Sequence, residues 1–227
     1  VQVLHRIMRH NIRNDLTKLR GYVELLESST DTDTREQRAA TVLEILENWE
    51  RMVSKIKYLR EILTSESDLF THRSVEQIIT DIRTKAEEEY TTASVTVTTE
   101  HDTELHVPDD LDKAISELVD NAITADKTGQ PSVQISVSKP DKRWVEICVS
   151  DTGPGLPEME KSLLETGEET PLSHGQGLGL WMVRALVTRV GGSVSVETSE
   201  DGTDITLEVP TQPSREDSQK PVPRRKL

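Results

Sequence analysis

Two oxygen-bearing side chains stand four residues apart in Glu-Leu-Val-Asp-Asn-Ala, positions 117–122. Positions four apart lie side by side on one face of a helix, so Glu117 and Asn121 can both present oxygen to a hard cation or a water molecule. Mg²⁺ typically takes one or two protein oxygens and completes its shell with water and phosphate. The pair therefore favours a magnesium–phosphate ligand.

Two glycine-rich motifs follow along the chain. In Asp-Thr-Gly-Pro-Gly, positions 151–155, a carboxylate after an expected strand can accept a hydrogen bond from an exocyclic amine, and the glycines let the backbone pass close to a flat ring. In Gly-Gln-Gly-Leu-Gly-Leu, positions 175–180, glycines lead into an expected helix whose free amides favour phosphate. Each motif alone is weak evidence, because glycine-rich turns are common. The motifs together predict a nucleotide site.

A histidine near the start of the chain could accept a phosphoryl group. His10 opens the run His-Asn-Ile-Arg-Asn-Asp-Leu, positions 10–16. A neutral imidazole nitrogen is nucleophilic near neutral pH. Ile12 and Leu16 belong to the expected apolar seam of a helix, so His10 is expected to lie off that seam and to meet solvent.

Over residues 70–210, the motifs resemble the ATP-binding fold shared by histidine kinases, DNA gyrase, heat-shock chaperone ATPases and mismatch-repair ATPases. The resemblance implies that Asn121 coordinates Mg²⁺ and that Asp151 binds the adenine amine of ATP. It implies a mobile cover over the nucleotide at residues 156–174. The base pocket would be lined by Gly153 and Gly155, and the phosphate side would be shaped by Gly175, Gly177, Leu178 and Gly179.

Over residues 1–65, the run that begins at His10 is similar to the phosphoacceptor motif of histidine kinases. The resemblance implies an ATP-dependent histidine autokinase of a two-component system. His10 would be the acceptor and would pass the phosphoryl group to an aspartate on the receiver domain of a response regulator. Asn14 would position a water molecule that hydrolyses this aspartyl phosphate.

Five positions depart from the family's pattern, and one of them is Ala125, which lies beside Thr124 in the expected adenine pocket. Asn11 replaces the usual acidic residue, and Glu117 stands where many histidine kinases have Asn, so we expect Glu117 to supply the general base that Asn11 cannot. Asp15 replaces a common helix-kinking proline, and Thr124 lies where a basic or aromatic side chain often lines the adenine site. Two alternatives remain open: an ATPase or serine kinase of the same superfamily that uses Glu117 as its base, and a degenerate scaffold that binds nucleotide.

Residues 1–66 are expected to form a helical hairpin for dimerisation and histidine phosphotransfer. Its first seam has the three-and-four spacing of a coiled coil. Its members are Ile12, Leu16, Leu19, Val23 and Leu26. A polar turn at 28–34 and a second seam at 42–63 follow. One hairpin has a single apolar stripe, which a homodimeric four-helix bundle would bury. The alternative is that the stripe packs on the next domain.

After a polar linker at 64–74, the pattern predicts an ATP-binding α/β sandwich with a mixed sheet, which makes the fold class α+β. Helices are expected at 75–90, 108–125 and 181–190, and strands at 94–99, 105–107, 133–138, 144–150, 193–198 and 204–209. Residues 211–227 are rich in proline and charge and are expected to form a disordered tail.

The composition excludes some partners. The formal net charge is −14, from 27 Lys and Arg against 41 Asp and Glu. A nucleic acid or a membrane surface is therefore not expected as a general partner, because both are polyanions. Acidity with only 3% aromatic residues resembles proteins of salt-loving archaea, although an ordinary acidic cytoplasmic protein is the alternative.

Cysteine content and hydropathy limit the chain further. The single cysteine, Cys148, excludes an internal disulfide and is expected to be a small core residue. No apolar window is long enough for a membrane span, and no signal peptide is visible. The chain begins within a helical pattern at Val1, so we expect a cytoplasmic fragment of a longer protein.

Overall fold

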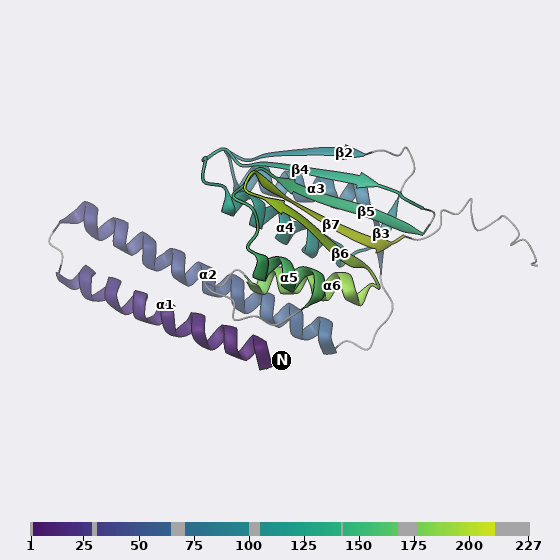
Figure 1. The fold of residues 1–227 in the computed structure, drawn as a ribbon. Helices are drawn as coiled ribbons and strands as arrows, with labels where there is room; N and C mark the ends of the chain where they lie inside the picture. Colours follow the sequence, from purple (N-terminus) through teal and green to yellow (C-terminus); the bar gives the residue numbers. More distant parts are fainter. Residues whose placement is uncertain are drawn as a thin grey trace, which may run out of the picture. The chain divides into compact units, whose positions relative to one another are not determined.

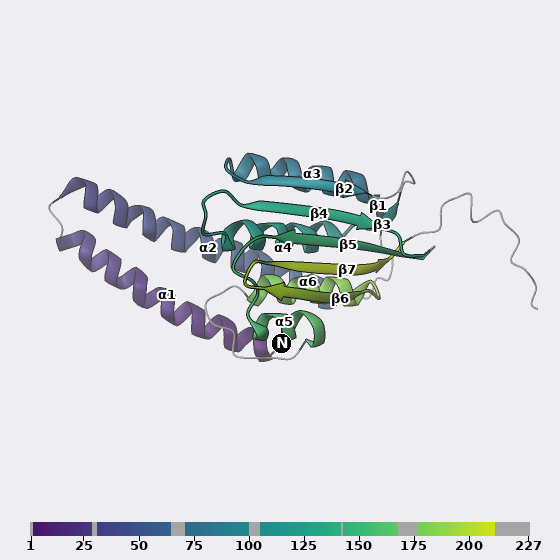
Figure 2. The ribbon, with the colours of Figure 1, turned by 45° about the horizontal axis from the view of Figure 1, so that its top comes forward.

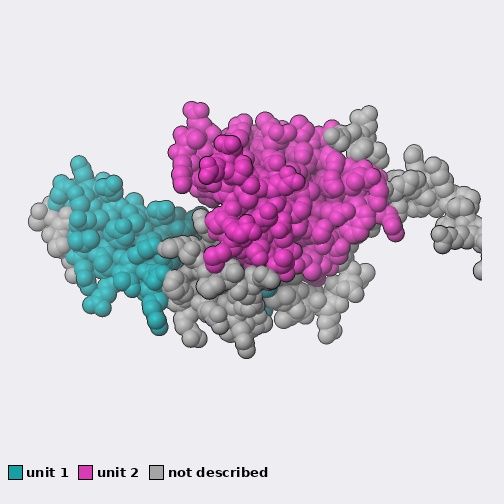
Figure 3. Space-filling model, viewed as in Figure 1, with its two compact units in different colours: residues 1–65, 169–182 teal, residues 66–168, 183–227 magenta. Residues whose placement is uncertain are grey.

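The computed structural model describes residues 2–28, 31–64, 71–99, 105–141, 143–167 and 177–211. Within these ranges it does not describe the side chains of residues 2–11, 27–28, 62–64 and 177. The chain divides into two compact units, one of residues 1–65 and 169–182 and the other of residues 66–168 and 183–227 (Figure 3).

The first unit contains an antiparallel pair of long helices, α1 (Gln2–Ser28) and α2 (Thr32–Thr64) (Figure 1). The helix α2 begins inside the run that was expected to be a turn, because Asp31 caps it: the backbone N–H of Thr34 donates to the Asp31 carboxylate at 2.9 Å. Arg38 ties the two helices together by donating to the carbonyl oxygen of Leu25 at 2.7 Å. The predicted hairpin is therefore present.

The hairpin leaves large apolar side chains in solvent. Leu16 is 52% exposed and Val53 is 60% exposed, although both belong to the expected seams. The other large apolar side chains of α1 and α2 that lie exposed are Val23, Leu25, Leu43 and Leu46.

No helix in the described ranges combines the length and the apolar character that a membrane span requires.

The second unit is built on a five-stranded sheet with the order β2-β4-β5-β7-β6 (Figure 2). Its strands are β2 (Ser94–Thr99), β4 (Ser132–Ser138), β5 (Trp144–Asp151), β6 (Ser193–Ser199) and β7 (Gly202–Pro210). The pair β2–β4 is parallel and the other pairs are antiparallel. The predicted mixed sheet and the α+β class are confirmed.

One face of the sheet carries the core. Along β5, Val145, Ile147 and Val149 are buried, while the alternating Glu146, Cys148 and Ser150 lie half-buried on the other face. Cys148 is therefore not the core residue that was expected, because its position in the alternation places it on the polar face. The helices α3 (Val75–Glu89) and α4 (Leu111–Ala125) pack on the apolar face, against β2 and against β4 and β5.

A second, two-stranded sheet joins β1 (His72–Ser74) to β3 (His106–Pro108). The expected linker therefore ends in a strand, and Arg73 fixes this strand through ion pairs to Asp81 at 2.5 Å and Asp109 at 3.2 Å. Thr211, which the sequence assigned to the tail, is buried and donates to the carbonyl oxygen of His106 at 2.8 Å. The rest of the expected tail lies outside the described residues.

The helix α5 (Glu158–Thr166) occupies part of the segment expected to be a mobile cover. That expectation is wrong for these residues, because Leu163 and Leu164 are buried. Arg184, on α6 (Gly177–Arg189), donates to the carbonyl oxygen of Leu164 at 2.6 Å. The backbone N–H of Val196, on the edge strand β6, donates to the Glu165 carboxylate at 3.0 Å. The remainder of the expected cover, 168–174, lies outside the described residues.

Candidate functional site

Asp151 is the last residue of β5 and the first residue of the glycine motif at 151–155. One of its carboxylate oxygens accepts a hydrogen bond from the backbone N–H of Gly153 at 2.7 Å. In the sheet Asp151 stands opposite Thr203 of β7, whose backbone N–H also donates to the carboxylate. Two backbone amides thus hold the carboxylate at the strand end.

Burial raises the pKa of Asp151 above its ordinary value, and the nearby charge of Asp204 raises it further. The hydrogen bonds from Gly153 and Thr203 lower this pKa, but burial is the largest influence. A carboxylate that has lost part of its hydration gains from a ligand that donates a hydrogen bond to it. An exocyclic amine is such a donor, so the environment of Asp151 suits the predicted role.

Gly155 could not be replaced by another residue without strain. Its φ is +78°, and a Cβ at this position would clash with the carbonyl oxygen of Ser199, at the end of β6. The next residue, Leu156, donates its backbone N–H to the hydroxyl of Thr198 at 2.7 Å. The glycine motif therefore rests directly on the β6–β7 hairpin.

The sequence did not predict that residues of the β6–β7 hairpin contact the Asp151 motif. Thr203 is buried, and Thr198 contacts the motif through its hydroxyl. They lie about fifty residues further along the chain, and the pairing of β5 with β7 and of β7 with β6 brings them to the motif. The one local signal is Gly202, which directly precedes Thr203 and turns the chain with a φ of +153°.

The helix α4 brings Glu117 and Asn121 to the same unit as Asp151, since α4 packs on β4 and β5. Glu117 is only 7% exposed, which is low for a carboxylate. In the described part of the chain, Asn121 Nδ2 is buried and has no hydrogen-bond partner. A buried amide without a partner is costly, and a polar ligand would relieve that cost. The partnerless group is an N–H donor, so it fits an acceptor such as a phosphate oxygen, while the side-chain oxygen of Asn121 is the atom that could bind Mg²⁺.

From Gly177 onward, the third motif is part of a helix and does not precede one. The helix α6 begins at Gly177, four residues earlier than expected. Its first four backbone N–H groups, which have no partner within the helix, therefore include those of Gly177, Leu178 and Gly179. The Leu178 side chain is 4% exposed and so serves the core, which leaves the backbone for the ligand. Gly175 lies outside the described residues.

His10 and Asn14 both belong to α1, four positions apart, which places them on one face of that helix. The side chain of His10 lies outside the described residues, and that of Asn14 is half-buried. The structure thus assembles Glu117, Asn121, Asp151, Gly153 and Gly155 in one unit. His10 and Asn14 belong to the other unit.

Residues 106–213 match a protein-family model described as histidine kinase-, DNA gyrase B-, and HSP90-like ATPase. Sporulation kinase B of Bacillus subtilis is 25% identical over 221 residues, which cover 92% of this chain and 50% of the relative. The histidine-protein kinase/phosphatase MprB of Mycolicibacterium vanbaalenii is 27% identical over 213 residues, which cover 85% of this chain and 42% of the relative. The chain thus spans half of one relative and less than half of the other.

Solved structures are similar as well. A mycobacterial sensor histidine kinase MprB is 25% identical with a TM-score of 0.54, and the match covers 64% of this chain and 99% of that chain. The histidine kinase ThkA, solved in complex with the response regulator TrrA, is 23% identical with a TM-score of 0.70 and covers 92% of this chain and 61% of that chain. At this lower identity, the likeness to ThkA concerns the fold alone.

Proposed function

Because residues 106–213 belong to the family of histidine kinase-, DNA gyrase B- and HSP90-like ATPases, we propose that this chain is the catalytic core of a sensor histidine kinase. It phosphorylates itself on His10 with ATP and transfers the phosphoryl group to an aspartate of a response regulator. The observation that carries the proposal is the occurrence, on one chain, of this ATPase domain and of a helical hairpin with the motif that begins at His10.

In the phosphorylation step, a neutral ring nitrogen of His10 attacks the γ-phosphorus. A nitrogen–phosphorus bond forms while the bond to the β–γ bridging oxygen breaks, and ADP leaves. Asp151 orients the substrate by accepting a hydrogen bond from the adenine amine. A Cβ at position 153 would crowd the Asp151 carboxylate that accepts from the base, and the backbone amides at the start of α6 would donate to the phosphates.

Asn121 would hold Mg²⁺ through its side-chain oxygen, and the ion supplies positive charge to the phosphate oxygens. The partnerless Nδ2 of Asn121 would donate to a phosphate oxygen beside the ion. In the described residues no group of three or more His, Cys, Asp or Glu side chains could hold a metal ion.

Glu117 removes the proton that the His10 ring loses on phosphorylation. Its carboxylate is one turn before Asn121 on α4 and is largely withdrawn from water, which favours proton transfer over simple solvation. Asn14 positions the water that hydrolyses the aspartyl phosphate of the partner, so the core is also a phosphatase.

The hairpin assembles as a homodimer, in which two copies bury their apolar stripes in a four-helix bundle. The exposed Leu16 and Val53 support this assembly. Val53→Glu is expected to shift the chain to a monomer in sedimentation experiments. Substitution of the exposed Glu47 is the control and should leave the dimer intact. A wild-type chain that sediments as a monomer at micromolar concentration would contradict the bundle.

The phosphotransfer takes place in the cytoplasm, where ATP is available, and the acidic composition supports an origin in a salt-loving archaeon. At multimolar salt the Debye length falls to about 3 Å or less, so repulsion among carboxylates is screened. Activity is then expected to rise between low and multimolar KCl. A chain that is fully active at low salt and inhibited by KCl would argue for an ordinary acidic protein.

Incubation with γ-labelled ATP tests the function. The wild-type chain is expected to take up a label that is lost in acid, and His10→Gln is expected to abolish it while ATP binding persists. Substitution of His5 provides the matched control. An acid-stable label that survives His10→Gln would instead identify the serine kinase that uses Glu117 as its base, and a failure to bind Mg–ATP would leave only a scaffold.

A further inference from the structure

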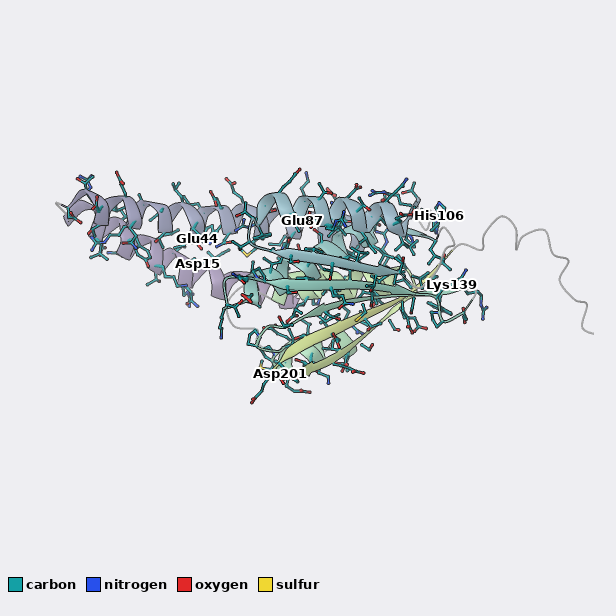
Figure 4. All side chains as sticks on the ribbon, turned by 90° about the horizontal axis from the view of Figure 1, so that it is seen from above. Asp15, Glu44, Glu87, His106, Lys139 and Asp201 are labelled. Carbon is teal, nitrogen blue, oxygen red and sulfur yellow. The ribbon has the colours of Figure 1, made fainter. Side chains whose placement is uncertain are left out.

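A hydrogen bond links the two helices of the hairpin beside the phosphoacceptor motif. Trp49 of α2 donates its indole N–H to a carboxylate oxygen of Asp15 of α1 at 3.0 Å. The other carboxylate oxygen lies 3.8 Å from the ammonium group of Lys18. The Asp15 side chain is 28% exposed and Trp49 is half-buried, so the bond is partly shielded from water. Figure 4 labels Asp15 on α1.

We propose that Asp15 and Trp49 are positioning residues for phosphotransfer at His10, an inference that rests on the proposed function. Asp15 follows His10 by five positions, which is about 7.5 Å along the helix axis. Trp49 belongs to the expected apolar seam of α2. The indole N–H of Trp49 reaches Asp15 only at one rotation of α1 about its axis and one position of α1 along α2. The bond therefore selects the orientation of the α1 face that carries positions 10 and 14.

The effect of a lost bond follows from helix geometry. A side-chain atom lies about 6 Å from the axis of a helix, so a rotation of about 10° moves it by about 1 Å. A displacement of about 1 Å in a phosphotransfer geometry can reduce the rate by about 100-fold. Apolar contacts alone tolerate small rotations, because they are not directional. A hydrogen bond restricts them, because its strength falls steeply away from a straight angle.

The carboxylate is used here as an acceptor and not mainly as a charge. The Lys18 side chain is 57% exposed and its ammonium group lies beyond ordinary hydrogen-bond distance, so this ion pair adds little. The nucleotide residues Asn121 and Asp151 belong to the other compact unit. A change at Asp15 should therefore alter the phosphotransfer rate and leave the binding of ATP unchanged.

The test compares Asp15→Ala, Asp15→Asn and Trp49→Phe in the full chain. Asp15→Ala and Trp49→Phe are each expected to lower kcat for labelling of His10 by about 10- to 100-fold with an unchanged KM for ATP. Asp15→Asn keeps an oxygen acceptor and is expected to restore at least half of the wild-type rate. The double variant Asp15→Ala/Trp49→Phe should be no slower than either single variant, because both remove the same bond.

Glu24→Ala is the matched control, since Glu24 is also a carboxylate of α1 but pairs, among the residues that the structure describes, with Arg20 of its own helix. It is expected to be as active as wild type, and circular dichroism should show the same helical content in all variants. Equal loss in Asp15→Asn and Asp15→Ala, an unaffected Trp49→Phe, or additive losses in the double variant would each overturn the inference. A wild-type chain that takes up no label on His10 would refute the proposed function instead.

Discussion

Asp151→Asn should separate nucleotide affinity from the stability of the fold. The carboxylate is held by backbone amides of Gly153 and Thr203, and its largest perturbation is loss of hydration. An Asn side chain can accept one of these hydrogen bonds without being charged. The substitution therefore removes an acceptor for the adenine amine without opening a hole in the structure.

The expected loss of ATP affinity can be worked out from the bond that disappears. A hydrogen bond to a charged group contributes about 1.5–3 kcal/mol when it is shielded. Asp151 is only half-buried, so the lower part of that range applies. At about 1.4 kcal/mol for each factor of ten, Asp151→Asn should weaken ATP binding by about 10- to 30-fold. The stability of the nucleotide-free protein should change by no more than about 1 kcal/mol.

The pH dependence gives an independent signature. Because the pKa of Asp151 is raised in the folded chain, its protonated form favours folding at low pH, and this contribution is lost as the pH rises through the folded-state pKa. ATP affinity moves in the opposite direction, since only the ionised carboxylate is the strong acceptor. Affinity should therefore fall on acidification, beginning above the usual Asp pKa of about 3.9, and Asp151→Asn should flatten this dependence.

Calorimetric titration with Mg–ATP from about pH 4 to about pH 8 measures the affinity lost in Asp151→Asn and the pH dependence of the wild type. Asp201→Asn is the matched control, because Asp201 is an exposed carboxylate of the β6–β7 turn (Figure 4). It should bind ATP like the wild type. The reasoning is refuted if Asp151→Asn binds ATP with unchanged affinity, or if acidification strengthens ATP binding to the wild-type chain.

Three other substitutions test the remaining parts of the site. Glu117→Gln should slow labelling of His10 by about 10²- to 10⁴-fold while ATP still binds in calorimetry, and a variant as fast as the wild type would exclude the general base. Asn121→Ala should bind ATP as weakly with Mg²⁺ as the wild type does in EDTA, and a persistent magnesium dependence would argue against this ligand. The melting temperature should not fall, because the substitution removes a buried N–H donor that has no partner among the described residues. Gly155→Ala should cost about 1–3 kcal/mol in denaturant unfolding, since its φ is +78° and its Cβ would meet Ser199, and an unchanged midpoint would contradict that close approach.

Secondary structure was predictable wherever the residue pattern was strong. The apolar run at 144–150 predicted the strand β5. Its buried face was not predicted, because Cys148 was expected in the core and the alternation buries Val145 and Ile147 instead. The prediction failed where tertiary packing overrode local composition. The segment that becomes α5 is polar and flanked by glycine, and its helix is stabilised by burial of Leu163 and Leu164 and by the hydrogen bond from Arg184. Such contacts come from distant parts of the chain and leave no local pattern.

The chemistry of the site was contained in the sequence, because the types and spacings of Glu117, Asn121 and Asp151 are local properties of α4 and β5. The sequence did not reveal the environment that tunes this chemistry. The raised pKa of Asp151 depends on burial and on Asp204, which only the pairing of β5 with β7 brings near. The bond between Asp15 and Trp49 likewise requires two helices to meet at one register. Residue type and spacing are fixed by the covalent chain, whereas desolvation and hydrogen-bond geometry arise only after distant segments have packed together.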